Sequence, residues 1–433
     1  MVDRSCNGQR NSVETSKIRT VLRQELGDPG EKILDGFLEE TGEKRLEFER
    51  IERFEDRLYQ RTKKTYGVER AEWIIDRIKK IRLQARLRDL KEERESKVQL
   101  MNRFETLKEL GNISLNLNEL ERAEEYYEEM HEVSRRLENE GLIVDALKNL
   151  GELYLFEGKL GEVKRKANEI IEKAEDEGKK AEGIKLAGLV AWRKGNSKEG
   201  LSYLERALKI FKEGSMIEKA ANTYRDMADI YIDQEEYEKG VELYEKGAGN
   251  FDEAGMDYER VGLLQEIGMI LSDRGEVERA MNYFEKMEKE ADESSLINLE
   301  AWSLFHQGEL HIEKGAYGDS EEKLERAVRM FEDQEDRHGE AGAKLTYGKL
   351  LTERGRSNDS EKMLKEAVGS FDELGLLDSK AEALYRLSQV QKEIGKSDTA
   401  ERNLENALQI YDSLDMEDMK EKIKEKLENR PNS

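Results

Sequence analysis

The sequence predicts an all-α fold, a solenoid of eight helix-turn-helix repeats of about 40 residues each. A small residue returns every 40 positions along most of the chain, and only one interval is three residues shorter. Self-similarity at a period of 20 to 50 residues is the sequence signature of a solenoid. We call these positions the first small column; they are Gly111, Gly151, Gly188, Ala228, Gly268, Gly308, Gly348 and Ser388.

The first helix of each repeat is predicted around this column. Apolar residues lie three or four positions apart near each small residue, as in Leu264, Ile267 and Leu271, which is the spacing of one helix face. Seven residues after the column comes a turn position that is usually glycine, which tolerates the left-handed conformation that ends helices. The glycines at this position are Gly158, Gly195, Gly275, Gly315, Gly355 and Gly395.

The second helix of each repeat is predicted around a second small column, which begins five residues after the turn position. A large residue usually follows four positions later, as Phe284 follows Ala280. Repeat two departs most from this order, because Val163 is followed by Ala167. The members of the second column are Ala123, Val163, Gly200, Gly240, Ala280, Ser320, Ser360 and Ala400.

Regions of different character flank the repeats of residues 98–415. Residues 1–30 are polar and end in Gly27-Asp28-Pro29-Gly30, which predicts a flexible N-terminal tail. Residues 31–97 are helical in pattern, and two long helices meeting at Tyr66-Gly67 would make a degenerate repeat that caps the stack. Residues 416–433 are predicted to form a C-terminal capping helix and tail.

Composition and charge exclude several classes of protein. The chain is 40% charged and 36% hydrophobic, which suits a thin helical stack with a large surface. Its net charge of −24 lies outside residues 1–100, which hold 24 basic and 21 acidic residues. Acidic repeats disfavour nonspecific binding of nucleic acid.

The location expected for the protein is the cytoplasm. Cys6 is the only cysteine and cannot form an internal disulfide. The first 30 residues lack an apolar signal segment, and no run of 18 apolar residues occurs anywhere. We therefore expect no membrane segment.

No constellation of residues predicts catalysis, a metal or a cofactor. His306 and His311 are five residues apart, which turns them to different faces of a helix. Gly395-Lys396-Ser397 is similar to the end of a phosphate-binding loop, but Val390 stands where that loop requires glycine. We expect a protein that is not an enzyme and holds no cofactor and no metal.

Two helices joined through small residues resemble the tetratricopeptide repeat (TPR). The motif is clearest in Glu-Ile-Gly-Met-Ile-Leu-Ser-Asp-Arg-Gly-Glu-Val-Glu-Arg-Ala-Met-Asn-Tyr-Phe-Glu-Lys-Met, residues 266–287. The 40-residue unit is longer than the usual 34 and is similar to the arms of kinesin light chains, spindle-orientation adaptors and bacterial signal regulators. The resemblance implies a right-handed superhelix whose first helices line a concave groove.

The resemblance also places a ligand-reading position three residues before the first column. The first four repeats are basic there, with Lys108, Lys148, Lys185 and Arg225; Gln265 follows, and the last three repeats have Phe305, Leu345 and Tyr385. Trp302 and Met269 add to the apolar half. A groove of this kind would bind a peptide or protein with an acidic segment and a hydrophobic anchor.

Two alternatives to this groove remain open at the level of sequence. Nearby carboxylates such as Asp145, Glu152, Glu182, Asp226 and Asp229 could neutralise the basic column, and Phe305 and Tyr385 could turn into the helix interface. Lys108, Asn112 and Asn149 are also similar to part of the carboxylate clamp of some TPR proteins. Glu182 and Leu186 depart from that pattern.

Binding of nucleic acid is the alternative function. A basic stretch lies on one predicted helix, interleaved with apolar residues that indicate packing, and could contact phosphates. Its members are Arg77, Lys79, Lys80, Arg82, Arg86, Arg88 and Lys91. We expect instead a non-catalytic scaffold or adaptor that binds a partner protein in its groove, and the sequence does not name the partner.

Overall fold

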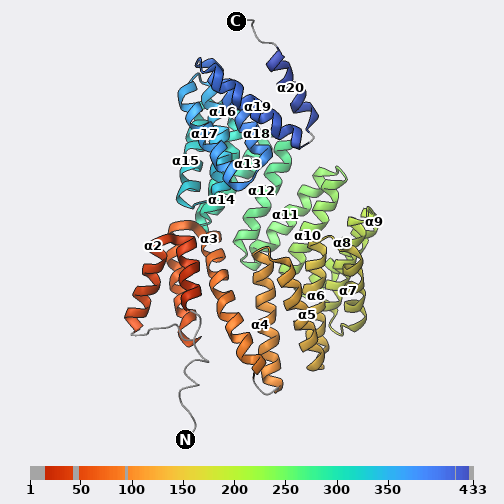
Figure 1. Cartoon of the computed structure of the whole chain (residues 1–433). Helices are drawn as coiled ribbons and strands as arrows, with labels where there is room; N and C mark the ends of the chain where they lie inside the picture. Colours follow the sequence, from red (N-terminus) through yellow and green to blue (C-terminus); the bar gives the residue numbers. More distant parts are fainter. Residues whose placement is uncertain (1–14, 42–47, 93–95, 415, 429–433) are drawn as a thin grey trace. The chain divides into compact units, whose positions relative to one another are not determined.

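The computed structural model describes residues 15–41, 48–92, 96–414 and 416–428, apart from some side chains within the helices. All regular structure in this part of the chain is helical (Figure 1). The chain divides into two compact units, Met1–Lys64 with Val68–Leu263 and Thr65–Gly67 with Leu264–Ser433. We call them the N-terminal and C-terminal units and describe each by itself.

The repeats are antiparallel helix pairs, as the two small columns predict. The first helices are α4 (Lys97–Asn116), α6 (Glu140–Phe156), α8 (Glu177–Arg193), α10 (Ile217–Asp233), α12 (Asp257–Asp273), α14 (Ile297–Glu313), α16 (Arg337–Glu353) and α18 (Leu377–Glu393). The second helices are α5 (Leu120–Arg136), α7 (Leu160–Lys173), α9 (Ser197–Glu213), α11 (Tyr237–Ala254), α13 (Val277–Glu293), α15 (Tyr317–Asp333), α17 (Ser357–Leu374) and α19 (Ser397–Ser413).

The first small column lies where the two helices of a repeat come closest. A Cβ on Gly268 would lie 2.5 Å from the ring of Phe284, and one on Gly308 would lie 2.6 Å from Leu324. Both distances are shorter than any normal carbon contact, so a larger residue would push the helices apart. Phe284 and Leu324 are the large residues that follow the second column, and both are buried.

The turn between the two helices is left-handed in all eight repeats. The residue seven positions after the first column has positive φ in each, including Asn118 (φ 56°) and Glu235 (φ 61°) where glycine is missing. This confirms the predicted turn position. Left-handed backbone is unfavourable for a residue with a Cβ, so Glu235 holds strain that glycine would not.

The single shortened interval falls in the second helix of repeat two. α7 has 14 residues, whereas α5 and α9 have 17. Gly151, the column residue of this repeat, faces Leu186 of the next repeat and the Cβ of Lys166 instead of a large side chain at position 167. The predicted irregularity of packing in repeat two is therefore real.

A recurring ion pair fixes the register between neighbouring repeats. The residue just after the second column is a glutamate at three junctions, and it contacts a cation eight positions after the first column of the next repeat. The pairs are Glu124 with Lys159 at 3.3 Å, Glu321 with Arg356, and Glu361 with Lys396 at 2.7 Å. Glu361 also accepts hydrogen bonds from Lys365 and Gln391.

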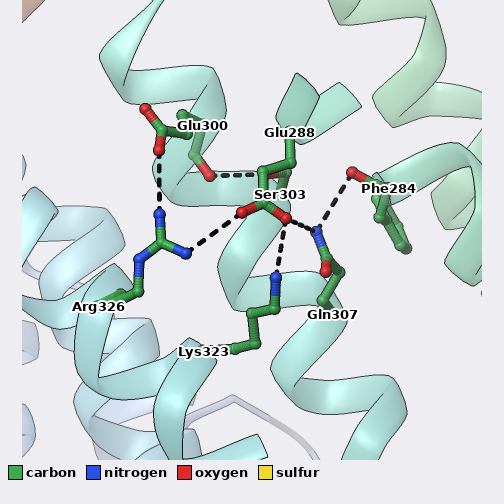
Figure 2. A network of polar contacts seen from close by, with 7 residues as sticks. All are labelled: Phe284, Glu288, Glu300, Ser303, Gln307, Lys323 and Arg326. Atoms are coloured by element: carbon green, nitrogen blue, oxygen red, sulfur yellow. Dashed lines mark hydrogen bonds and ion pairs between the residues drawn. The ribbon is translucent and has the colours of Figure 1, made fainter. Parts of the chain in front are cut away.

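A larger polar network joins three helices of the C-terminal unit (Figure 2). Glu288 on α13 accepts hydrogen bonds from Gln307 on α14 and from Lys323 on α15, both at 2.8 Å. Arg326 bridges Glu288 and Glu300 at 3.3 Å each. Burial alone would raise the pKa of Glu288, but Lys323 and Gln307 outweigh it and hold that pKa below its usual value.

Residues 15–30 are not a flexible tail, and that prediction is wrong for them. They belong to α2 (Thr15–Thr41), which turns back on itself at Gly27 (φ 61°) and continues after Pro29. Arg19 contacts Asp35 across this turn, and Ile18 and Leu22 are fully buried. Apolar residues at helical spacing between the polar ones decide the structure here. Residues 1–14 lie outside the described part.

The next helical segment, α3 (Phe48–Glu92), also doubles back. Arg82 donates hydrogen bonds to Glu55 at 3.0 and 3.1 Å, although a straight helix would hold residues 27 apart at about 40 Å. Two arms that meet near Tyr66-Gly67 satisfy this contact, as predicted. The second arm contacts the first repeat through Gln84 and Tyr126, which is what a capping repeat requires.

The C-terminal end of the stack is closed by α20 (Glu417–Glu428). Ile423 is fully buried and packs in a cluster with Ala381 and Tyr411 of the last repeat. Lys420 contacts Asp412 and Glu417 at 2.6 Å each. Among the described side chains of α20, Ile423 is the buried apolar one, and a role as the terminal cap remains a prediction.

Replacing Glu235 by glycine should stabilise the protein by about 0.5 to 1 kcal/mol, because it removes the Cβ from a left-handed turn. Chemical denaturation followed by circular dichroism measures this change. The control Glu205→Gly, in the exposed interior of α9, should destabilise by about 1 kcal/mol. Destabilisation by Glu235→Gly would show that the turn is not left-handed in solution.

Replacing Glu361 by glutamine should destabilise the last repeats at neutral pH and reduce their sensitivity to acid. Hydrogen bonds from Lys365 and Lys396 lower the pKa of Glu361 to about 2. A carboxyl with a lowered folded-state pKa contributes stability above its unfolded pKa and loses it as pH falls through the folded value, here from about pH 5 to about pH 2. We expect a loss of about 1 to 3 kcal/mol at pH 7 and little difference from wild type near pH 2. Urea unfolding at several pH values measures this, with Glu405→Gln, exposed on α19, as the control. Equal acid sensitivity in Glu361→Gln and wild type would contradict the assignment.

Candidate protein-binding surface on the first helices

The four basic residues three positions before the first column lie on consecutive first helices of the N-terminal unit. Lys108 is on α4, Lys148 on α6, Lys185 on α8 and Arg225 on α10. The first helices also lie next to one another, because α8 contacts both α6 and α10 besides its own partner α9. Lys148, Lys185 and Arg225 therefore lie on adjacent first helices, and we call the face of α4, α6, α8 and α10 that holds the four basic residues the first-helix surface.

Carboxylates of the neighbouring helices neutralise the two middle lysines. Lys185 contacts Asp226 at 2.8 Å, and both side chains are less than one-fifth exposed. Lys148 lies 3.5 Å from Glu182 and 3.6 Å from Glu152. The alternative in which nearby acids neutralise the column is thus confirmed for Lys148 and Lys185.

A second row of lysines, which the sequence reasoning missed, joins the same helices. Lys179 contacts Asp145 at 2.7 Å, and Lys219 contacts Glu182 at 2.7 Å. In both pairs the lysine is nine positions before its column residue and the acid six positions before the previous one. This signal is present in the sequence once the repeats are aligned on the first small column.

Lys148 and Glu152 show how closely protein surrounds this surface. Burial raises the pKa of Glu152, and Lys148 offsets only part of that effect. Burial alone would lower the pKa of Lys148, but Glu152 and Glu182 raise it above its usual value. Half of the Glu152 side chain still reaches solvent. Water therefore reaches Glu152 on one side, while Lys148 pairs with it on the other.

The two outer cations of the column are free of ion pairs. Lys108 is half-buried and Arg225 is exposed. Neither forms an ion pair with any residue in the described ranges 15–41, 48–92, 96–414 and 416–428. These two, rather than Lys148 and Lys185, are the cations that could meet a partner without first losing an internal contact.

The two asparagines of the predicted clamp differ in their contacts. The side-chain carbonyl of Asn112 accepts a hydrogen bond from Tyr127 at 2.7 Å. The amide nitrogen of Asn149 is buried and has no hydrogen-bond partner among the described residues. A buried donor without a partner costs about 1 to 3 kcal/mol, so Asn149 gains if a partner's oxygen binds there.

The apolar half of the predicted groove is largely internal. Phe305, Leu345 and Tyr385 are 9%, 7% and 2% exposed and belong to the hydrophobic cores of the C-terminal unit. Their assignment as partner contacts is wrong, and the alternative of packing between helices is confirmed. At this repeat position the side chains of the last three repeats are apolar and are buried, because burial of apolar surface is favourable, whereas the charged side chains of the first repeats stay nearer to solvent.

Other residues of this half remain partly accessible. Met269 and Gln265 are half-buried, and Gln265 lies 3.4 Å from His306. Trp302 is half-buried and packs edge-on against Phe331, with ring centroids 5.1 Å apart. His306 stacks on Phe284 at 4.7 Å. The sequence reasoning did not foresee that histidines would complete this aromatic cluster.

The basic stretch on α3 is mainly occupied by contacts within the protein. Arg77 contacts Glu25, Lys80 contacts Glu119, and Arg82 contacts Glu52 and Glu55. Burial raises the pKa of Glu55 even though Arg82 donates two hydrogen bonds to it. These cations hold the N-terminal helices together, which weakens the nucleic-acid alternative.

The rest of the stretch is less constrained. Lys79 is half-buried and Arg86 is exposed, whereas Arg88 is exposed but has an interaction within the protein. The side chain of Lys91 lies outside the described residues. A phosphate-binding surface would therefore have few free cations.

Comparison with known proteins gives one family match and several similar folds. The model of the soluble NSF attachment protein family, SNAP, matches residues 157–330, less than half of the chain. The apo form of RapI is similar over 72% of this chain and 86% of its own, with 15% identity and a TM-score of 0.59. No curated protein matches.

A second solved structure with the same TM-score is PH0952 from Pyrococcus horikoshii, a signal transduction ATPase with a TPR sensor. It is 15% identical, and the match covers 82% of this chain and 57% of PH0952. At such identities the likeness shows the fold, which is an α-solenoid of antiparallel helix pairs. The repeats are of the TPR type, as the motif of residues 266–287 predicts.

In the described part of the chain, none of the helices has the length and apolar character needed to cross a bilayer. Within the same residues, no group of three or more His, Cys, Asp or Glu side chains is arranged to hold a metal ion.

Replacing Arg82 by methionine should destabilise the N-terminal helices by about 3 to 5 kcal/mol, because it leaves Glu55 buried without its cation. Hydrogen exchange of residues 48–92 measures this loss. Arg86→Met, which removes an exposed arginine of the same helix, should have little effect. A folded Arg82→Met variant whose only defect is weaker binding to a random-sequence duplex at low salt would overturn the structural role and restore the nucleic-acid alternative.

Proposed function

We propose that the protein is a non-catalytic scaffold whose first-helix surface binds a partner protein or peptide through an acidic segment. The observation that carries this proposal is the pair of unpaired cations, Lys108 and Arg225, at equivalent positions of a surface whose inner lysines are already neutralised. A cation without an internal partner is available to a ligand carboxylate at little cost.

The buried amide of Asn149 supports the same reading, because it offers a hydrogen bond that the described protein does not use. A repeat array also presents side chains from several helices in fixed positions, so it loses little conformational entropy on binding. The TPR part of PH0952 is a sensor, and a role in recognition here agrees with that. The hydrophobic anchor that the sequence predicts would not contact Phe305, Leu345 or Tyr385, since these side chains are internal.

The structure changes which residues a test should alter. Reversing the charge of Lys148 or Lys185 would place a new carboxylate beside Glu182 or Asp226, so lost binding could reflect lost stability. Lys108 and Arg225 have no such role among the described residues. A variant with both changed to glutamine separates binding from folding.

Lys108→Gln combined with Arg225→Gln should weaken binding of an acidic partner by about threefold to tenfold at physiological salt, with unchanged thermal unfolding. Quantitative mass spectrometry of pull-downs from nuclease-treated lysate measures this effect and identifies the partner. Lys164→Gln combined with Lys209→Gln removes the same charge from exposed positions of second helices and should bind like wild type.

Equal recovery of every protein by the two double variants would remove the first-helix surface from the proposal. Equal losses from both would point to net charge rather than to a binding site. Measuring the partner at two salt concentrations adds a check, since the contribution of the two cations should shrink as salt rises.

A further inference from the structure

A cavity of about 520 Å³ lies in the first two repeats, away from the ligand-reading positions of the first-helix surface. It is formed chiefly by the second helices α5 and α7, with one residue from α4. Its lining is almost entirely charged. The lining residues are Arg103, Glu128, Glu129, His131, Glu132, Arg135, Arg165, Lys166 and Glu169.

His131 is one of two buried donors in this cavity. Its side chain is 6% exposed, and its Nε2 has no hydrogen-bond partner among the described residues. Burial lowers the pKa of His131, and the nearby Arg135 and Lys166 lower it further, whereas Glu169 and Glu128 offset part of this effect. A buried ring nitrogen without a partner costs about 1 to 3 kcal/mol unless a bound group satisfies it.

Lys166 is the second buried donor, and it is poorly paired. It is 3% exposed, and its nearest carboxylate oxygen, on Glu128, is 4.0 Å away. That distance is beyond a normal hydrogen bond. Burial lowers the pKa of Lys166, and Glu128 offsets only part of that effect. A lysine in this position gains from any additional anion.

Lys344 in the C-terminal unit shows what a satisfied buried lysine looks like in the same fold. It is 5% exposed and contacts Glu332, Glu340 and Glu366 at 2.6 to 2.9 Å. Burial alone would lower the pKa of Lys344, but these three carboxylates hold it above its usual value. The two lysines are about equally buried, but Lys344 has three close carboxylate partners and Lys166 has one distant partner. Lys166 is therefore incompletely paired.

The remaining charges of the cavity are paired or exposed, except for Glu169, which is half-buried and raises the pKa values of His131 and Lys166 slightly. Arg103 contacts Glu129 at 2.6 Å, and Arg165 contacts Glu162. Glu128, Glu132 and Arg135 are exposed, where water and salt screen them. Lys166 favours an acceptor with negative charge, and Nε2 of His131 donates a hydrogen bond to the same acceptor when the ring carries its proton on that nitrogen.

The geometry points to a carboxylate-binding site, in which Lys166 and Nε2 of His131 together hold the carboxylate of a ligand that enters between α5 and α7. The carboxylate belongs either to a small organic acid or to a polypeptide, as an acidic side chain or a C-terminus. This site involves different residues from the first-helix surface, so it stands or fails independently of the proposed function.

Nuclear magnetic resonance of the histidine rings tests this site in the full chain. The protein has four histidines, and His131→Gln identifies the signal of His131. Acetate and glutamate are the small probes, and acetamide is the neutral match for acetate. An acetylated tripeptide with a free C-terminus, compared with its amidated twin, tests the polypeptide source.

We expect acetate or one of the larger carboxylates to shift the His131 signal saturably and to raise the pH at which it titrates, with the other three histidines unchanged. Acetamide and the amidated peptide should have no effect. Lys166→Met should weaken the response about tenfold or more, whereas Lys164→Met, at an exposed position of the same helix, should keep it.

Three results would overturn the inference. One is an unchanged His131 signal in wild type with every probe, which would leave water as the occupant. Another is an equal shift of all four histidines, which would indicate a general salt effect. The third is an undiminished response in Lys166→Met; if that variant does not fold, the comparison of acid with amide in wild type decides alone.

Discussion

The close contact between glycine and a large side chain, which recurs in most of the helix pairs, is the constraint on which the rest of the structure depends. Where Gly268 faces Phe284 and Gly308 faces Leu324, there is no room for a Cβ. The pair of helices is therefore locked at one separation and one axial position. Because the same contact recurs along the chain, the distance of any other residue from the column decides what its side chain faces. It faces its own partner helix, the next repeat or solvent.

Polar contacts add register to this packing more than they add hydrophobic stabilisation. The pairs of Glu124 with Lys159 and of Glu361 with Lys396 occur at the same offset from their columns, one in each unit. Such a pair disfavours a shifted register between neighbouring repeats, because a shift would separate the two charges. Half-buried pairs of this kind are worth more than exposed ones because less water screens them. The lysine and acid pairs of the first-helix surface fix the register between successive first helices in the same way.

The 40-residue periodicity predicted the features that recur from repeat to repeat, but it could not predict features that occur in a single repeat. The columns, the left-handed turns and the shortened repeat follow from single residues such as Gly188 and Gly275, because each has many counterparts. The inward rotation of Phe305 and Tyr385 did not, since the same position is polar in other repeats and only packing partners from the next repeat decide its direction. The helix of residues 15–30 was missed because Gly27 and Pro29 mark a tight hairpin as readily as a tail.

The two candidate sites also differ in whether they arise from a repeated feature or from a feature of one repeat. Periodicity predicts the first-helix surface from the sequence. Two of its four cations, Lys148 and Lys185, form ion pairs with the next repeat and are not free to bind a partner. The cavity of Lys166 and His131 lies beside the shortest of the second helices, α7, where Ala167 replaces a large residue. An array is stable when each junction satisfies its own polar groups, as Lys344 shows. A buried ring nitrogen without a partner among the described residues, Nε2 of His131, and a buried lysine with one distant partner, Lys166, are therefore better explained by something that binds there than by the requirements of the fold.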